Sequence, residues 1–301
     1  MGIRTDLALE ARENLSYVPE GVDASEEEKG NIKITRVTVK NFMGEIHLRK
    51  PQGQYITLDM KNIASMLPEE RKETASAVAE ELKKLIGKMD GGVLVVGLGN
   101  RAITPDSIGP KTCDGIFVTR HIKEHIPEAI DERASTVFAI APGVLGVTGL
   151  ESLEVIKGIV SQTHPELVIA VDALAARNIS RIGASIQITD SGISPGAGLG
   201  NRREGLNDRN LSVRVIAIGV PTVVYASTIA ADIIDEMMDN VDSELKEKLI
   251  SKTEGTKGAE LVVSPKDIDV LSTHASKLLA HAINMAVNPY ISDEEIEAYM
   301  D

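Results

Sequence analysis

Two aspartates, Asp106 and Asp172, each follow a short continuous run of branched apolar residues. Residues 91–110 read GGVLVVGLGNRAITPDSIGP, and residues 166–177 read ELVIAVDALAAR. Such runs are typical of strands that are buried on both faces and that deliver functional groups at the carboxyl edge of a parallel sheet. Two carboxylates brought close can share a proton, so that one serves as a base toward water and the other as an acid toward a carbonyl or a leaving amine.

Each aspartate also has a purely structural interpretation. Asp106 would be a turn or N-cap residue before a helix near Pro110, and Asp172 would cap a helix starting at Ala173. A functional role is favoured because a carboxylate beside a buried strand is costly unless it is used or well hydrogen-bonded. The carboxylate pair is therefore the leading candidate for chemistry.

Two glycine-rich stretches offer a competing interpretation as nucleotide sites. GLGNRA, at residues 97–102, has the spacing of the dinucleotide fingerprint and follows an expected strand. That fingerprint must open directly into a helix facing the pyrophosphate, whereas Pro105 and Pro110 interrupt the segment here. Residues 191–203, SGISPGAGLGNRR, lack the Gly-Lys-Ser/Thr ending of a phosphate loop and are interpreted as a flexible loop or lid. No cofactor site is predicted.

Metal and nucleophile motifs are weak. His121 and His125 have helical i, i+4 spacing, but no Glu lies between them in the HEXXH position and no third ligand is evident. A surface pair is the simpler interpretation, and no metal site is predicted. The single Cys113 has no evident catalytic partner, and no serine lies in a G-x-S-x-G elbow.

Composition limits the class of protein. The 301 residues are 43% hydrophobic with a mean hydropathy of -0.02, which is the balance of a globular chain. A formal net charge of -13 argues against a direct nucleic-acid partner, which requires a basic surface. One cysteine, a charged N-terminus and no apolar run of about 18 residues argue against export and membrane insertion. The expected location is cytoplasmic.

Strand and helix patterns alternate along most of the chain, which predicts a three-layer α/β/α fold with a mostly parallel or mixed sheet. Residues 1–30 are polar and are interpreted as a leader or propeptide segment, and residues 31–301 as a single domain with a small N-terminal β addition at about 31–60. That addition is expected to hold three strands, IKITRVTV, GEIHLRK and YITLDM. Further strands are expected at 93–97, 135–141, 167–172, 181–189 and 213–220.

Helices are expected between these strands and at the end of the chain. Pro68 opens the first, and Thr148 with Glu151 fits a capping box for another. Ser264 is the expected cap of the last, which runs to about Val287. The remaining helical patterns lie at about 110–126 and 226–238, and the charged segment 239–263 is interpreted as a surface excursion.

Several long motifs resemble the germination protease family of spore-forming bacteria. They are VVGLGNRAITPDSIGP, APGVLGVTGLE, VDALAAR, QITDSGISPGAGLGNRR and AIGVPTVV, and the resemblance covers nearly the whole chain. It implies an endopeptidase of phosphorylase/hydrolase-like α/β/α fold that degrades small acid-soluble spore proteins during germination. It also implies an atypical aspartic-type enzyme made as a zymogen, a homotetramer in the spore core, active without a metal. The catalytic aspartates of the family correspond to Asp106 and Asp172.

Two alternatives are kept. Hydrogenase maturation proteases share the strand, GxGN and acidic-residue arrangement, which would make this chain a metal-dependent peptidase. The chain could instead be a non-catalytic binding protein for spore proteins that retains the fold.

The segment Thr5–Ala11, TDLALEA, is similar to the sequence at which the family cuts its substrates, after the acidic residue. Asp6 and Leu7 are therefore the candidate self-processing site, in a terminus expected to be exposed and mobile. The alternative is that Asp6 caps a short helix.

Overall fold

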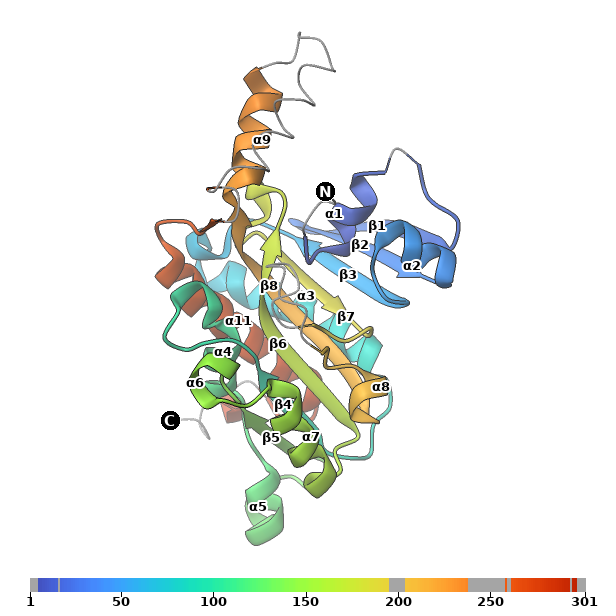
Figure 1. Ribbon diagram of the computed structural model, residues 1–301. Helices are drawn as coiled ribbons and strands as arrows, with labels where there is room; N and C mark the ends of the chain where they lie inside the picture. Colours follow the sequence, from blue (N-terminus) through green and yellow to red (C-terminus); the bar gives the residue numbers. More distant parts are fainter. Residues whose placement is uncertain are drawn as a thin grey trace.

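A nine-stranded mixed sheet forms the centre of the computed structural model, which describes residues 5–15, 17–194, 204–237, 258, 261–292 and 294–296 (Figure 1). The strand order is β1-β2-β3-β7-β8-β6-β4-β5, with β9 paired to β8. The strands β8, β6, β4 and β5 are mutually parallel, whereas the pairs among β1, β2, β3, β7 and β8 are antiparallel. The strands are β1 (Val22–Lys29), β2 (Ile32–Val39), β3 (Gly53–Asp59), β4 (Val93–Gly97), β5 (Val137–Ile140), β6 (Leu167–Ala176), β7 (Ser185–Thr189), β8 (Arg214–Tyr225) and β9 (Val262–Val263).

Helices cover both faces of this sheet, which confirms the predicted three-layer class. Side chains of α3, α4 and α11 join the largest apolar cluster on one face, and those of α7 and α8 join a second cluster on the other. The α-helices are α1 (Ala8–Glu13), α2 (Phe42–Leu48), α3 (Pro68–Ile86), α4 (Ile108–Asp114), α5 (Arg120–His125), α6 (Leu145–Thr148), α7 (Ser152–Thr163), α8 (Asp208–Leu211), α9 (Ala226–Met237) and α11 (Ile268–Val287). Short 3₁₀ helices are η1 (Ile63–Ser65), η2 (Thr104–Asp106), η3 (Pro127–Ala129) and η4 (Ile179–Arg181).

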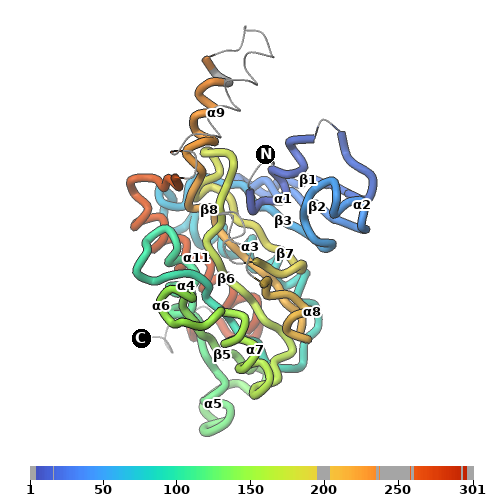
Figure 2. The backbone as a smooth tube through the Cα atoms, viewed as in Figure 1, coloured from blue at the N-terminus to red at the C-terminus, as the bar shows by residue number. Residues whose placement is uncertain are grey.

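The central strands are apolar on both faces because both faces are covered. In β4, Val93 and Val95 face the cluster with α3 and α11, while Leu94 and Val96 face the cluster with α7. At the β1–β3 end, α1 and α2 cover the α7 side of the sheet, packing on Val37, Val39 and Tyr55 (Figure 2). Between these two groups of helices, Gln187 of β7 and Gly219 of β8 line a cavity on that face.

The order in which successive parallel strands are added to the sheet reverses at β4. The chain passes from β4 to β5 on one side and then to β6 on the other side of β4. Such a topological switch point leaves a crevice at the carboxyl ends of the two diverging strands, here β4 and β6, where ligands of open α/β sheets bind.

Several local predictions are corrected by the structure. GEIHLRK is not a strand: it contributes to α2, whose N-cap Asn41 accepts a hydrogen bond from the Gly44 N–H at 3.1 Å. The capping box of α7 is formed by Glu151 and Glu154 rather than by Thr148 and Glu151. The last helix begins at Ile268 and not at Ser264.

The polar N-terminal region is also more structured than its composition indicates. Residues within 1–30 form α1 and β1, and β1 pairs with β2 over its whole length. Seven of its eight residues are exposed, so β1 carries no apolar period. It is a charged edge strand, of the kind that discourages pairing with other chains.

Some predicted features lie outside the described residues. Most of the proposed lid at 191–203 and nearly all of the charged segment 239–263 belong to this group. In the part of the chain that the structure describes, no helix has the length and apolar character needed to cross a membrane.

Candidate active site

Asp172 lies within β6, one residue beyond the end of β4. Gly97, the last residue of β4, is opposite Val171, and β6 continues to Ala176 by pairing with β8. The predicted strand end at Asp172 and the helix at Ala173 are therefore both wrong. The Asp172 side chain is 5% exposed, and its Oδ1 accepts a hydrogen bond from the Ala173 N–H at 2.9 Å.

Asp106 ends the 3₁₀ helix η2 in the loop that follows β4. Its Oδ2 accepts a hydrogen bond from the Asn100 N–H at 2.8 Å, and the side chain is partly exposed. Gly99 has a φ of +108° and lies against the Asp106 backbone, so a side chain there would both strain the loop and collide with it.

The first turn of α4, just after Asp106, packs closely on β6. A Cβ on Gly109 would lie 2.5 Å from the Val171 carbonyl oxygen and 2.2 Å from that of Leu98, so only glycine permits this approach. The helix η2 also packs against β6 and β8. Both aspartates therefore stand near the carboxyl end of β4, Asp106 in the loop that follows it and Asp172 in the part of β6 that extends beyond it.

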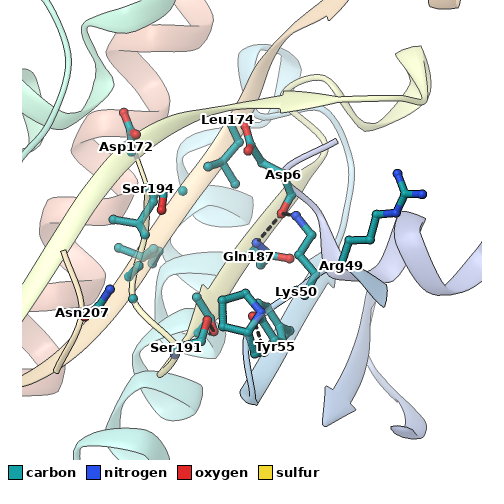
Figure 3. A pocket seen from close by; sticks show the side chains of 17 residues that line it. Asp6, Arg49, Lys50, Tyr55, Asp172, Leu174, Gln187, Ser191, Ser194 and Asn207 are labelled. Carbon is teal, nitrogen blue, oxygen red and sulfur yellow. Dashed lines mark hydrogen bonds between the residues drawn. The ribbon is translucent and has the colours of Figure 1, made fainter. Parts of the chain in front are cut away.

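A cavity of about 230 Å³ lies on the α7 side of the sheet, and Asp172 belongs to its lining (Figure 3). Asp106 is not part of its lining. The opposite wall carries Arg49, Lys50 and Tyr55. Burial lowers the pKa of the Lys50 ammonium, partly offset by the nearby carboxylates of Asp6 and Glu10, and burial raises the pKa of Tyr55.

The candidate processing residues Asp6 and Leu7 lie at this cavity rather than on a free terminus. Asp6 lines the cavity, its N–H donates to the Ala175 carbonyl at 2.9 Å, and its Oδ2 accepts from the Ala175 N–H at 2.8 Å. Leu7 is fully buried and is itself the N-cap residue of α1, so Asp6 does not cap that helix. The expectation of an exposed, mobile segment does not hold for Asp6 and Leu7.

Comparison with known proteins places this arrangement in a family. A family model described as germination protease matches residues 4–254. The chain belongs to the germination protease family. It is 42% identical to the germination protease of Clostridium tetani over 100% of both chains, and 43% identical to that of Clostridium acetobutylicum over 99% of both. It is 35% identical to the germination protease of Bacillus subtilis over 99% of this chain and 96% of the relative.

The predicted family is thus confirmed, and with it the class of protein: a peptidase of spore germination. Among solved structures the chain is similar to the [NiFe] hydrogenase maturation protease HycI from Thermococcus kodakarensis KOD1. That likeness has a TM-score of 0.38 and 16% identity, and it covers 69% of this chain and 98% of that one.

Of the other motifs considered from the sequence, GLGNRA adjoins Asp106 through Gly99 and Asn100, but it lacks the geometry of a dinucleotide site. GLGNRA is followed by η2 and not by a helix opening at Ala102. His121 and His125 are exposed on α5. Burial raises the pKa of the Cys113 thiol to about 12, and its Sγ donates to the Ile140 carbonyl at 3.3 Å. Among the described residues no three His, Cys, Asp or Glu side chains are gathered as a metal site would require.

Sequence reasoning missed several polar side chains of the cavity, among them Lys50 and Gln187. Gln187 is polar between Ile186 and Ile188 in a strand, and this alternation could have marked it as facing a different environment from its neighbours. Lys50 follows α2, a helix that the sequence did not predict, and no local signal distinguishes it from a surface lysine.

Proposed function

We propose that this chain is an endopeptidase that hydrolyses small acid-soluble spore proteins with a water activated by Asp106 and Asp172. The observation that carries the proposal is the position of both carboxylates at the β4/β6 switch point, with Asp172 buried at the wall of a cavity. One aspartate, ionised, takes a proton from water, while the other, protonated, polarises the scissile carbonyl and then protonates the leaving amine. The atypical aspartic-type class follows from this pair.

The proposal extends to the setting of the enzyme. We infer a self-processing zymogen cut between Asp6 and Leu7, assembled as a homotetramer in the spore core, with no direct nucleic-acid or membrane partner. Support comes from the membership of the family and from the position of Asp6 at the same cavity as Asp172. The acidic net charge of -13 supports the absence of a nucleic-acid partner.

Replacing either aspartate tests the mechanism. Asp106→Asn and Asp172→Asn should each lower turnover of a purified spore protein by at least about a hundredfold, which is the low end for the loss of a general acid or base. Asp23→Asn is the matched control, because Asp23 is an exposed aspartate of β1 paired with Lys40. Turnover is followed by mass spectrometry, with circular dichroism and size-exclusion chromatography to verify fold and assembly. Near wild-type cleavage by either variant would remove that residue from the mechanism.

The same assay separates the metal-dependent alternative. We expect exhaustive chelation to leave cleavage intact, because a carboxylate pair needs no metal to activate water. Activity that disappears on chelation and returns only with an added divalent metal would replace the aspartic mechanism by a metallopeptidase one.

A further inference from the structure

The N-terminal segment occupies one end of the cavity through its backbone. Figure 3 shows Lys50 and Gln187 pointing toward Asp6. Asp172 lies apart from these three residues, on β6. Lys50 Nζ donates to the carbonyl oxygens of both Thr5 and Asp6, each at 2.9 Å. The Lys50 ammonium, which burial disfavours, thus binds main-chain oxygens of a single segment.

Gln187 binds the same segment from the sheet. Its Nε2 donates to the Asp6 carbonyl oxygen at 3.1 Å, and its Oε1 accepts from the Ala8 N–H at 2.7 Å. The Asp6 carbonyl oxygen therefore receives two donors, one of them charged. Paired donors on one carbonyl are the arrangement that polarises an acyl group and stabilises the negative charge that develops on its oxygen.

Gln187 and Asp172 belong to one row across the sheet. Gly219 of β8 is opposite both residues, so the two side chains lie on the same face. Since Gly219 has no side chain and strands are spaced about 4.8 Å apart, a strip roughly 10 Å wide separates the two backbones. An extended peptide held at Gln187 thus lies beside the Asp172 wall of the cavity.

Release of the chain as far as Asp6 would uncover these donors. Leu7 and Ala8 are fully buried and stay with the protein, so Gln187 keeps its bond to the Ala8 N–H. Lys50 Nζ and Gln187 Nε2 would lose their carbonyl acceptors, and the Ala175 N–H would lose the Asp6 carboxylate. Each lost acceptor leaves a donor that a new ligand can satisfy.

We propose that Lys50 and Gln187 are substrate-positioning residues, and that the place of Thr5 and Asp6 receives the acidic residue of a peptide substrate. This assignment rests on the proposed function. The substrate carbonyl takes the donors of Lys50 and Gln187, and its acidic side chain takes the Ala175 N–H beside the Lys50 charge. Because Leu7 keeps its place, the substrate residue that follows the acidic one enters the cavity instead of following the path of α1. The N-terminal segment of the protein then occupies the substrate site of the same chain, in the way that a substrate would.

Two peptides and two variants test the assignment. The peptides copy residues 3–12 of the chain with Asp or with Asn at the position of Asp6. The full chain is first incubated at mildly acidic pH until its N-terminus no longer changes. In the wild type, kcat/KM for the Asp peptide should exceed that for the Asn peptide by at least about tenfold, and Lys50→Met should lower this ratio toward one. Lys61→Met is the control, because Lys61 is an exposed lysine that pairs with Glu70.

Gln187→Glu gives an independent result if Lys50→Met does not fold. Glutamate keeps an oxygen for the Ala8 N–H but replaces the N–H donor by a carboxylate oxygen, which adds a negative charge. The Asn peptide carries no charge at that residue for the new carboxylate to repel, so its rate reports mainly the loss of the donor. For this peptide kcat/KM should fall by about tenfold, the effect of one lost hydrogen bond to a carbonyl.

The outcomes separate the assignment from the proposed function. If Lys50 and Gln187 only anchor the N-terminus, replacing them should speed the loss of Met1–Asp6. The ratio of kcat/KM for the Asp and Asn peptides, and kcat/KM for the Asn peptide, would then stay at wild-type values. That result overturns the assignment alone. A wild-type chain that cleaves neither peptide nor a spore protein overturns the proposed function and the assignment with it.

Discussion

Buried carboxylates in this chain differ in what surrounds them. Glu81 of α3 is 2% exposed and binds Arg36, whose Nη2 lies 2.8 Å from Oε1. Glu10 of α1 is 2% exposed and accepts from the N–H groups of Arg177 and Asn178 at 2.7 and 2.8 Å. Asp172, by contrast, lines a cavity. The first two join distant elements, which accounts for their burial, while the position of Asp172 at a cavity agrees with the role proposed for it.

Glu81 provides a prediction for acid stability. Burial alone would raise the pKa of Glu81, but hydrogen bonds from Arg36 and Lys84 outweigh it and hold the pKa below the ordinary 4.5. The folded state thus binds this proton less tightly than the unfolded state, so the stabilisation is present above about pH 4.5 and is lost as the pH falls through the lowered pKa. Glu81→Gln should lower the free energy of unfolding by roughly 1–3 kcal/mol at pH 7, the range for hydrogen bonds to charged groups.

Urea unfolding between pH 7 and pH 3 measures this effect. The difference between Glu81→Gln and the wild type should shrink below about pH 4.5. Glu80→Gln is the neighbouring control, because Glu80 is an exposed partner of Lys29 and should change stability by less than about 1 kcal/mol. A difference that stays constant over the whole pH range would show that the Glu81 charge contributes nothing.

Close packing of α4 on β4 and β6 positions the preceding loop, which carries Asp106. Gly97 and Gly109 are in direct backbone contact, since a Cβ on Gly97 would lie 2.2 Å from the Gly109 carbonyl oxygen. Gly109→Ala should therefore push the first turn of α4 off β6, shift the loop before it and lower cleavage by about ten- to a hundredfold, because misplacement by about 1 Å has costs of this order.

Gly158→Ala is the matched control for this substitution. Gly158 is exposed in the middle of α7 and a Cβ there meets nothing within 4 Å. Alanine should raise the free energy of unfolding by up to about 1 kcal/mol and leave cleavage unchanged. Peptide cleavage and thermal melting of both variants decide the point; wild-type turnover by Gly109→Ala would contradict the role assigned to the loop.

The elements show how far sequence reasoning extends. The existence of β4 and β6 follows from local apolar runs, which need no knowledge of distant residues. The extension of β6 beyond Asp172 does not, because it depends on pairing with β8. The strand β1 could not be predicted in this way, because it is held by pairing with β2 and not by an apolar face. The docking of Asp6 depends on Ala175, 169 residues away, and no local pattern records such a contact.

At the scale of the whole molecule, the N-terminus and the cavity wall form one assembly. The segment that contains the candidate processing bond is tied to β6 through Ala175 and to β7 through Gln187. The Glu10 carboxylate anchors α1 to the residues after β6. A cut after Asp6 would therefore remove only the part of the segment that lines the cavity, and α1 would stay in place.

Self-processing is the last prediction, and its expected result follows from this arrangement. After incubation at mildly acidic pH, N-terminal sequencing of the wild type should give a new terminus at Leu7, and Asp172→Asn should keep its original terminus. Because Leu7 is fully buried, the segment must leave its position before it is cut, so processing should be slow and should follow local opening rather than global unfolding. The melting temperature should change by only a few degrees, since Leu7 and the Glu10 contacts remain. An unchanged terminus in fully active enzyme would refute self-processing at Asp6 and leave the segment a permanent part of the cavity wall.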